Sequence, residues 1–355
     1  MWTIHNEVTG RTIKNNEFCV NGDPSELANQ YNKYILSIVP ELISNLNTKP
    51  FKCSISPNCE SMYMTPVNVE EICELGKQIK NKYSSGIDEI PACLVKAIIP
   101  TICEILCFLI NNSFKYGIFP NQLKMAVIKP IYKKGDSDLM ENYRPISILP
   151  SFSKIFELAM SRRLLGFFNK CKLLNPHQHG YISDKSTQTA IFQFIKAILR
   201  HLEASNLVLG FCLDLSKAYD CIDAELLIEK LELYGVRGNA SKLFASYLSD
   251  RQQKVKITKN GSTFMSETLY NGLGIAQGSI LGPILFIIFV NDLFSIANCQ
   301  TENITCYADD TNLTVGGKNL NDVVSKGNTI INKASDWFTE NKLILNKKKT
   351  NIIMF

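Results

Sequence analysis

The stretch Cys306-Tyr307-Ala308-Asp309-Asp310-Thr311-Asn312-Leu313 decides the fold of this chain. Short alternating runs flank its two adjacent aspartates, at 304–307 and 312–315, and this pattern predicts a tight β-hairpin with acid at its tip. Two neighbouring carboxylates repel each other unless a cation neutralises them. An isolated Asp-Asp pair is more often a polar turn. The apolar run before it, the aromatic Tyr307 and partners upstream favour a divalent-metal site here.

Length and composition predict a large folded core with two or three subdomains. The chain has 355 residues, 45% of them hydrophobic, and a formal net charge of +5. Its lysines cluster in two runs. These are Lys124, Lys129, Lys133 and Lys134, and then Lys347, Lys348 and Lys349. Such runs are usually solvated faces, but two of them on either side of the same acidic centre favour a polyanionic partner.

Cysteine usage and hydropathy indicate the cellular compartment in which the protein would fold. Twelve cysteines occur without a Cys-x-x-Cys pair, which fits a reducing compartment better than a secreted disulfide scaffold. Cys171 with His177 and His179 is a weak zinc candidate, because structural zinc sites prefer tighter spacing. The first residues are too polar for a signal peptide. The apolar run 280–290 contains Gly282 and Pro283 and is too short to span a bilayer, so we expect no membrane partner.

The coarse pattern along the chain alternates amphipathic helices with short strands. Residues 1–65 read as a leader or linker around one helix at 24–39. The helix expected at 92–114 is hydrophobic on all sides, which predicts burial. Other helices are expected at 67–79, 151–165, 187–201, 224–234, 239–248, 280–293 and 328–341. Strands are expected within 125–136, where the strand ends in a basic loop, and at 207–213, 251–258, 263–269 and 351–355, with Asn260-Gly261 as a hairpin turn.

Asp214 directly follows a continuous apolar run, Leu207–Leu213, of strand length. A run of this kind is typical of a strand buried in a sheet, and catalytic groups often lie at the carboxyl end of such a strand. The alternative is an aspartate that only caps a turn. Asp223, by contrast, reads as the N-cap of the following helix, which Gly235 ends.

Two further segments suit a phosphate-bearing ligand. Arg144 precedes a proline, which favours extended backbone, and its guanidinium could fork onto phosphate oxygens or form a surface salt bridge. The glycine-rich segment 272–279 precedes an apolar helix, and its backbone could approach a ligand closely. Three carboxylates from distant positions, converging in one sheet, suit two magnesium ions and in-line phosphoryl transfer. The combination predicts nucleotidyl transfer.

The same segments, in this order, resemble the reverse transcriptase domain of non-LTR (LINE-type) retrotransposons, closest to the jockey and CR1 groups. The resemblance covers roughly residue 67 to the end. It rests on Ser84-Ser85-Gly86-Ile87-Asp88, Tyr143-Arg144-Pro145-Ile146-Ser147, Phe211 to Asp220, Ala276 to Pro283, Tyr307-Ala308-Asp309-Asp310 and Lys349-Thr350. Ala276 stands where the family usually has proline, a change that removes no functional group.

The resemblance implies a role for each matching residue. Asp214, Asp309 and Asp310 would be the catalytic carboxylates and hold two Mg²⁺ ions, for which Mn²⁺ can substitute, helped by the carbonyl of Leu215. Lys349 would lie near the pyrophosphate and donate a proton. Tyr219 would exclude a 2′-hydroxyl and so select deoxynucleotides. The remaining substrate-binding residues would be Lys133 and Arg144 at the triphosphate and Gln277 and Gly278 near the sugar and template.

The resemblance also implies a fold and partners. We expect an α/β (α+β) right-hand polymerase with an antiparallel palm sheet backed by helices, with fingers at 66–205 and palm at 206–355, interrupted by an insertion near 235–270. No thumb is expected after Phe355. The partners would be an RNA template, a DNA primer and dNTPs, bound mostly through phosphate and sugar. We expect an intracellular ribonucleoprotein, in the nucleus or cytoplasm.

Two alternatives remain. An RNA-dependent RNA polymerase commonly has Gly before the Asp pair and needs a gate that admits the 2′-hydroxyl, so Ala308 and Tyr219 count against it. A catalytically silent, element-derived fragment that only binds nucleic acid is favoured by the abrupt end of the chain on an apolar strand.

Overall fold

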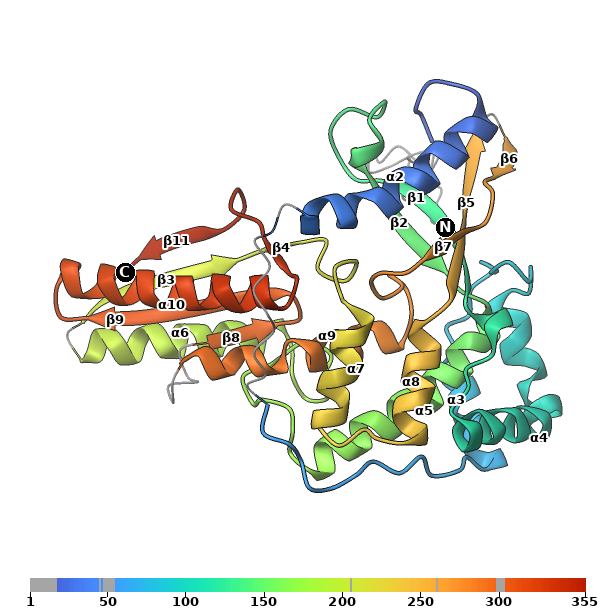
Figure 1. Cartoon of the computed structure of the whole chain (residues 1–355), viewed down its shortest axis with the longest axis horizontal. Coiled ribbons are helices and arrows are strands. Elements are labelled where there is room, and N and C mark those ends of the chain that lie inside the picture. The colour runs from blue at the N-terminus through green and yellow to red at the C-terminus, as the bar shows by residue number, and fades with distance from the viewer. Residues whose placement is uncertain (1–17, 45, 47–54, 205, 260, 298–303) are drawn as a thin grey trace, which may run out of the picture.

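The computed structural model describes residues 18–44, 46, 55–204, 206–259, 261–297 and 304–355, in a mixed arrangement of helices and sheets (Figure 1). The N-terminal stretch 1–17 and the turn residue Asn260 lie outside the described residues. Three sheets and a group of helices make up the described part.

The acidic stretch forms the predicted hairpin. Strand β8 (Ile304–Tyr307) pairs antiparallel with β9 (Asp310–Gly317), which pairs in turn with β3 (Leu207–Leu213). The last strand, β11 (Asn351–Met354), adds to the other edge of β3 and gives the order β11-β3-β9-β8. The expected antiparallel sheet around the acidic hairpin is therefore present.

Helices cover both faces of this sheet. Gly327 of α10 (Leu320–Glu340) meets Phe211 on one face, whereas α6 (Thr187–Glu203) lies against Gly316 on the other. Figure 1 shows the two helices running along the sheet. Helix α10 begins eight residues before the predicted start, where the Asn319 side chain accepts the Asp322 N–H as an N-cap.

A second sheet lies beside the first. It follows the order β2-β1-β5-β6, and β7 also pairs with β5. Its strands are β1 (Met125–Tyr132), β2 (Tyr143–Ile148), β5 (Arg251–Lys259), β6 (Ser262–Met265) and β7 (Leu269–Asn271). A small sheet joins β4 (Leu215–Ser216) to β10 (Ile344–Leu345).

The remaining helices pack below the two larger sheets in Figure 1 and share one apolar core with the acidic sheet. They are α3 (Val69–Gln78), α4 (Ala92–Tyr116), α5 (Ser151–Lys170), α7 (Ala224–Leu233), α8 (Asn239–Leu248) and α9 (Leu281–Phe289). Short 3₁₀ turns occur at Asn121–Leu123, Met140–Asn142 and Asn291–Ala297. Asp223, the predicted cap of α7, and Asn68 before α3 each accept a backbone N–H at the start of their helix.

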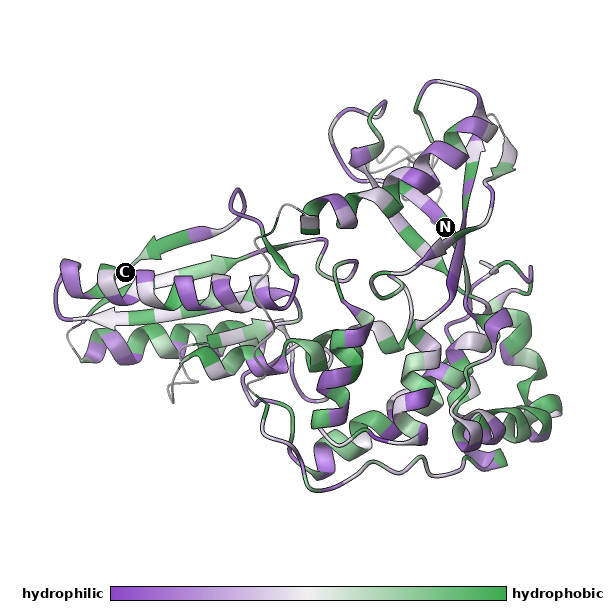
Figure 2. Ribbon diagram, in the orientation of Figure 1, coloured by the Kyte–Doolittle hydropathy of each residue, from purple (hydrophilic) through white to green (hydrophobic). Residues whose placement is uncertain are grey.

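Helix α4 differs from its prediction. It runs unbroken through Pro100, and only one side of it is buried. Ile105, Phe108 and Leu109 are exposed, and Figure 2 shows hydrophobic residues around much of its surface. By length and composition α4 alone, among the helices described, could cross a membrane. High hydropathy therefore did not bring burial on all sides.

The N-terminal segment is not a free leader where the structure describes it. Helix α2 (Pro24–Ser44) buries Tyr31 completely, and the Tyr31 hydroxyl donates to the backbone oxygen of Tyr143 in β2. The Phe18 ring packs edge-on against Tyr31 and at a tilt against Tyr143. Residues 18–44 thus form a small core with the second sheet.

Candidate active site

Sheet register brings the predicted carboxylates to one end of the acidic sheet. Tyr307 pairs with Asp310 across the hairpin, and Leu213 pairs with Thr311. Asp214 follows Leu213 directly, so it emerges beside the start of β9. Ala308 takes the left-handed conformation with φ of 56°, which closes the turn.

These groups line a cavity of about 710 Å³ between the two larger sheets. Of the residues singled out from the sequence, nine line it, from both sheets and the glycine-rich loop. They are Lys133, Arg144, Asp214, Leu215, Tyr219, Gln277, Gly278, Asp309 and Lys349. Asp310 is the exception: it is exposed and does not line this cavity.

The acidic end of the cavity is short of positive charge. Burial raises the pKa of Asp309, the charge of Asp214 raises it further, and Lys349 only partly offsets both. Partial burial raises the pKa of Asp310, as do the charges of Asp309 and Asp214. The three carboxylates therefore act on one another, and a bound cation would relieve their repulsion.

Their arrangement differs from the expected three-ligand site. Among the described residues, no group of three or more His, Cys, Asp or Glu side chains is placed to hold a metal ion. The Lys349 ammonium lies 2.8 Å from Asp214 Oδ2 and forms an ion pair with this carboxylate. The donor set is nonetheless suited to a hard cation, because Asp214 and Asp309 present carboxylate oxygens to one cavity.

The opposite wall is basic. Arg144 pairs with Ile131 across β1 and β2, so the extended backbone predicted before Pro145 is confirmed. Burial lowers the pKa of Lys133, and the positive charges of Arg144 and Lys349 lower it further. With Lys217, four basic side chains line this one cavity, and together they favour a multiply charged anion there.

Tyr219 forms a rigid part of the cavity wall. Its ring stacks on Phe286 of α9 with centroids 4.6 Å apart and an interplanar angle of 24°. Its hydroxyl donates to the hydroxyl of Tyr181 at 3.4 Å. Burial raises the pKa of the Tyr219 phenol, so the group stays neutral and able to donate.

The glycine-rich loop packs against β2 and against the segment after Asp214. The Ser147 N–H donates to the Gln277 carbonyl at 3.0 Å, and a Cβ on Gly278 would stand 2.6 Å from the Ser147 oxygen. Gly278 also has φ of 123°, so the position favours glycine on both grounds.

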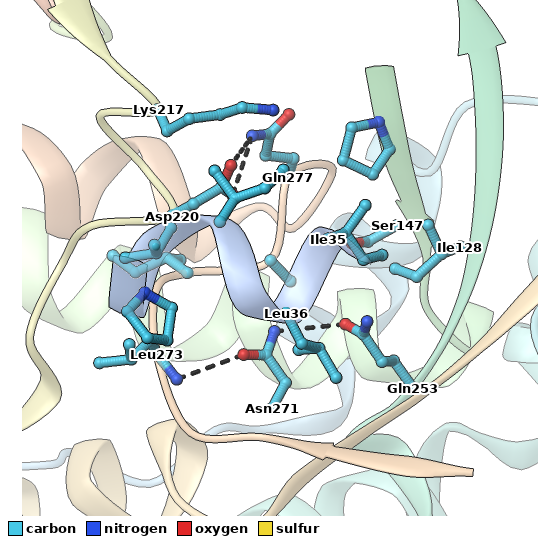
Figure 3. A pocket seen from close by; sticks show the side chains of 16 residues that line it. Ile35, Leu36, Ile128, Ser147, Lys217, Asp220, Gln253, Asn271, Leu273 and Gln277 are labelled. Carbon is cyan, nitrogen blue, oxygen red and sulfur yellow. Dashed lines mark hydrogen bonds between the residues drawn. The ribbon is translucent and has the colours of Figure 1, made fainter. Parts of the chain in front are cut away.

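The Gln277 side chain is held by a residue that sequence reasoning passed over. Its Nε2 donates to both carboxylate oxygens of Asp220, at 2.9 and 3.0 Å (Figure 3). Burial raises the pKa of Asp220, although Lys217 opposes that shift. The two side chains face a small cavity of about 60 Å³ that Leu36 of α2 also lines, so the N-terminal helix reaches close to the site.

Three other residues at the site were missed. Glu157 of α5 is fully buried and accepts the N–H groups of Ile280 and Leu281 at the start of α9, so it fixes the end of the glycine-rich loop. Tyr181 lines the cavity, and Gln178 bonds to the acidic turn. Each comes from a distant segment without a local motif around it.

Cys171, His177 and His179 do not form the zinc site considered above, because the described residues contain no group of three or more His, Cys, Asp or Glu side chains that could hold a metal ion. His179 Nδ1 instead lies 2.8 Å from the Thr189 hydroxyl, and Cys171 lies against Glu60. Cys103 is buried, and Cys107 packs against the core.

Comparison with known proteins decides the family. The model of the reverse transcriptase (RNA-dependent DNA polymerase) family matches residues 131–354. The chain belongs to the reverse transcriptase family. That match includes every residue singled out above for the cavity, from Lys133 to Lys349, and it confirms the resemblance drawn from the motifs.

Curated relatives from the fruit fly point to non-LTR elements. The chain is 29% identical over 302 residues to "Probable RNA-directed DNA polymerase from transposon BS" of Drosophila melanogaster, covering 82% of this chain and 32% of that protein. It is 25% identical over 314 residues to "RNA-directed DNA polymerase from mobile element jockey" of the same species, covering 84% and 33%. This reverse transcriptase chain thus spans about a third of the length of these relatives.

Proposed function

We propose that this chain carries out RNA-directed DNA synthesis for a non-LTR retrotransposon, extending a primer 3′-hydroxyl with dNTPs on an RNA template. One observation carries the proposal: Asp214 and Asp309 line the same cavity as Lys133 and Arg144. Nucleotidyl transfer needs carboxylates for cations beside the reacting phosphorus and basic groups for the remaining phosphates.

The carboxylates are the residues that would hold magnesium. Asp214 and Asp309 would hold it directly, with Asp310 as the third carboxylate and the Leu215 carbonyl alongside. When bound, a pair of such ions stabilises the attacking and leaving oxygens of an in-line displacement. The raised pKa values of Asp309 and Asp310 support this assignment, because an uncompensated acidic cluster gains most from a cation.

The other residues bind and orient the nucleotide. Lys133 and Arg144 would hold the triphosphate, and Lys349 would protonate the departing pyrophosphate. Tyr219, held against Phe286, would stand below the sugar and exclude a 2′-hydroxyl. Gln277 lines the same cavity. Its side-chain Nε2 donates to Asp220, so its side-chain Oε1 is the atom left to contact the substrate.

The arrangement of sheets supports a division into regions. The acidic sheet with α10 corresponds to a palm, within the proposed 206–355, whereas α6, which covers the other face of that sheet, comes from the end of the segment proposed as fingers. The sheet of β1 and β2 and the helices α3 to α5 correspond to fingers, within the proposed 66–205. Strands β5 and β6 lie in the segment proposed as an insertion, yet β5 pairs in parallel with β1, which ties that segment to the fingers sheet.

A primer-extension assay tests the proposal. The chain is given an RNA template, a DNA primer, Mg²⁺ and either dNTPs or rNTPs, with Tyr219→Val as a gate variant. We expect the unchanged chain to extend the primer with dNTPs only. We expect Tyr219→Val to lower the preference for dNTPs over rNTPs by roughly ten- to 200-fold, the range for small changes in a pocket. Equal use of rNTPs by the unchanged chain would favour an RNA polymerase. Retention of RNA without any extension would favour the silent fragment.

A further inference from the structure

A short segment outside the acidic sheet holds the turn that carries Asp309. Residues 177–181, His-Gln-His-Gly-Tyr, connect α5 to α6, and we call them the strap. The strap runs beside β8: the Cys306 N–H donates to the His177 carbonyl at 3.0 Å, and the His179 N–H donates to the Cys306 carbonyl at 2.8 Å. Gln178 and Cys306 form a parallel bridge between them. The strap thus adds an extra strand-like edge to the hairpin at its tip.

The Gln178 side chain makes the decisive contact. Its Oε1 accepts the N–H of Ala308 at 3.1 Å and the N–H of Gly180 at 2.9 Å. Ala308 is the left-handed residue of the turn and directly precedes Asp309. One buried amide oxygen therefore ties the strap to the Tyr307–Ala308 peptide, one residue before Asp309.

The contact of Gln178 comes with an energetic cost. Gln178 is 0% exposed, and its Nε2 has no hydrogen-bond partner within the described residues. A buried donor without a partner is costly, and a hydrophobic side chain of similar size would avoid that cost. The acceptor function of Oε1 is thus the feature that distinguishes glutamine from such a side chain here.

Close packing at Gly180 sets the distance between strap and turn. A Cβ on Gly180 would stand 2.4 Å from the Ala308 nitrogen, which real side chains do not tolerate. Gly180 is not among the residues with positive φ, so this requirement is steric rather than conformational. Tyr181 follows at once and presents its hydroxyl to Tyr219, so the strap contacts the cavity at two points.

We propose that Gln178 is a positioning residue for Asp309: through the Ala308 N–H it holds the acidic turn in the conformation that nucleotidyl transfer needs. This inference rests on the proposed function for its consequence in catalysis. Its structural half, the restraint of the turn, stands independently and can be measured in a chain without activity.

Hydrogen–deuterium exchange measures the restraint. In the full chain, we expect Gln178→Met to speed exchange at the Ala308 amide about five- to tenfold, the effect of losing one hydrogen bond. Gly180→Ala should speed it too, because the added methyl pushes the strap off the turn. Gln178→Glu keeps an acceptor and should restore protection. Asn111→Leu is the matched control, since its amide holds the backbone of Val67 in the same way, away from the cavity.

Primer extension measures the consequence. We expect Gln178→Met and Gly180→Ala to raise the Mg²⁺ concentration for half-maximal extension about tenfold, as loss of an outer partner of a metal ligand does. Gln178→Glu should return it toward the original value, and Asn111→Leu should leave it unchanged while lowering the melting temperature.

The outcomes separate the two claims. If the exchange rate at the Ala308 amide is unchanged in both Gln178→Met and Gly180→Ala, the strap does not restrain the turn. Faster exchange with an unchanged Mg²⁺ requirement in an active chain overturns the positioning role. If the unchanged chain extends no primer, the proposed function fails, whereas the exchange experiment still decides whether the strap restrains the turn.

Discussion

Two groups of charges in this protein are built in opposite ways. In the helical core, Lys230 and Asp292 are almost fully buried and lie 2.6 Å apart. Lys230 also donates to the Phe289 carbonyl, and the Trp337 indole donates to the second oxygen of Asp292. At the acidic turn, by contrast, three carboxylates repel one another, and the ammonium of Lys349 only partly offsets this repulsion.

The contrast distinguishes a scaffold from a site. Polar atoms around the Lys230–Asp292 pair satisfy both charges within the protein, so no ligand is needed. The acidic turn keeps an excess of negative charge, which disfavours the folded state until a cation binds. Incomplete neutralisation, rather than charge itself, therefore marks the functional region.

Removing an acid from the turn should produce the largest effect. Loss of a residue that hydrogen-bonds to a metal ligand lowers activity roughly 10–100-fold. We expect Asp309→Asn, which changes a proposed ligand itself, to lower the rate of primer extension by more than this. Without metal, the same variant should melt no lower than the unchanged chain, because it relieves repulsion. Thermal denaturation and extension assays check both.

The control for this variant is Asp322→Asn on the surface of α10, where Asp322 pairs with Lys326. It should keep full activity and lose a little stability. Asp309→Asn with normal activity, or with a large loss of metal-free stability, would contradict the contrast drawn above.

Breaking the buried pair should have the reverse signature. Lys230→Met leaves the Asp292 carboxylate buried without its partner, so we expect a loss of about 3–5 kcal/mol in the free energy of unfolding. The activity per folded chain should stay unchanged, because both residues are buried and neither lines the cavity. Denaturant unfolding followed by extension assays on the folded fraction measures both.

Lys326→Met is the matched control, because Lys326 and Asp322 form an exposed pair at 3.0 Å. Its cost should be about 0–1 kcal/mol. Equal losses in the two methionine variants would mean that burial does not distinguish the pairs.

The smallest expected effect is a dependence on pH. The pKa of Asp309 and that of Asp310 are raised in the folded chain, so the fold binds protons more readily than the unfolded chain at these positions. Their repulsion should therefore weaken as pH falls through the raised values, and it should be fully present above them.

The measurement is the difference in melting temperature between Asp309→Asn and the unchanged chain without metal. We expect this difference to shrink as pH falls from about 7 toward about 4, the usual range of an aspartate. A difference that grows on acidification would show that the turn is stabilised, not destabilised, by its charges.

Local patterns predicted most of the fold and the two central acids. The acid after a buried apolar run located Asp214, and the alternating flanks of an acid pair located Asp309. Both signals are local, because strand periodicity and a turn are properties of neighbouring residues. The helix ends at Asn68 and Asp223 were predictable for the same reason.

Contacts between distant segments escaped prediction. Gln178 lies 130 positions from Ala308, and Asp220 lies 57 positions from Gln277. No periodicity links such pairs, so only the folded chain reveals them. The exposed side of α4 was missed for a related reason: hydropathy reports the cost of exposure and says nothing about which neighbours are present to prevent it.

The most direct test of the central claim counts metal ions at the acidic turn. Mn²⁺ binding is measured by electron paramagnetic resonance in the chain bound to an RNA template, a dideoxy-terminated primer and the matching dNTP. We predict about two bound ions per chain, as in-line nucleotidyl transfer requires, and fewer in Asp309→Asn. Equal Mn²⁺ binding by the unchanged chain and by Asp309→Asn would contradict the account, since it would show that the Asp309 carboxylate does not bind the cations.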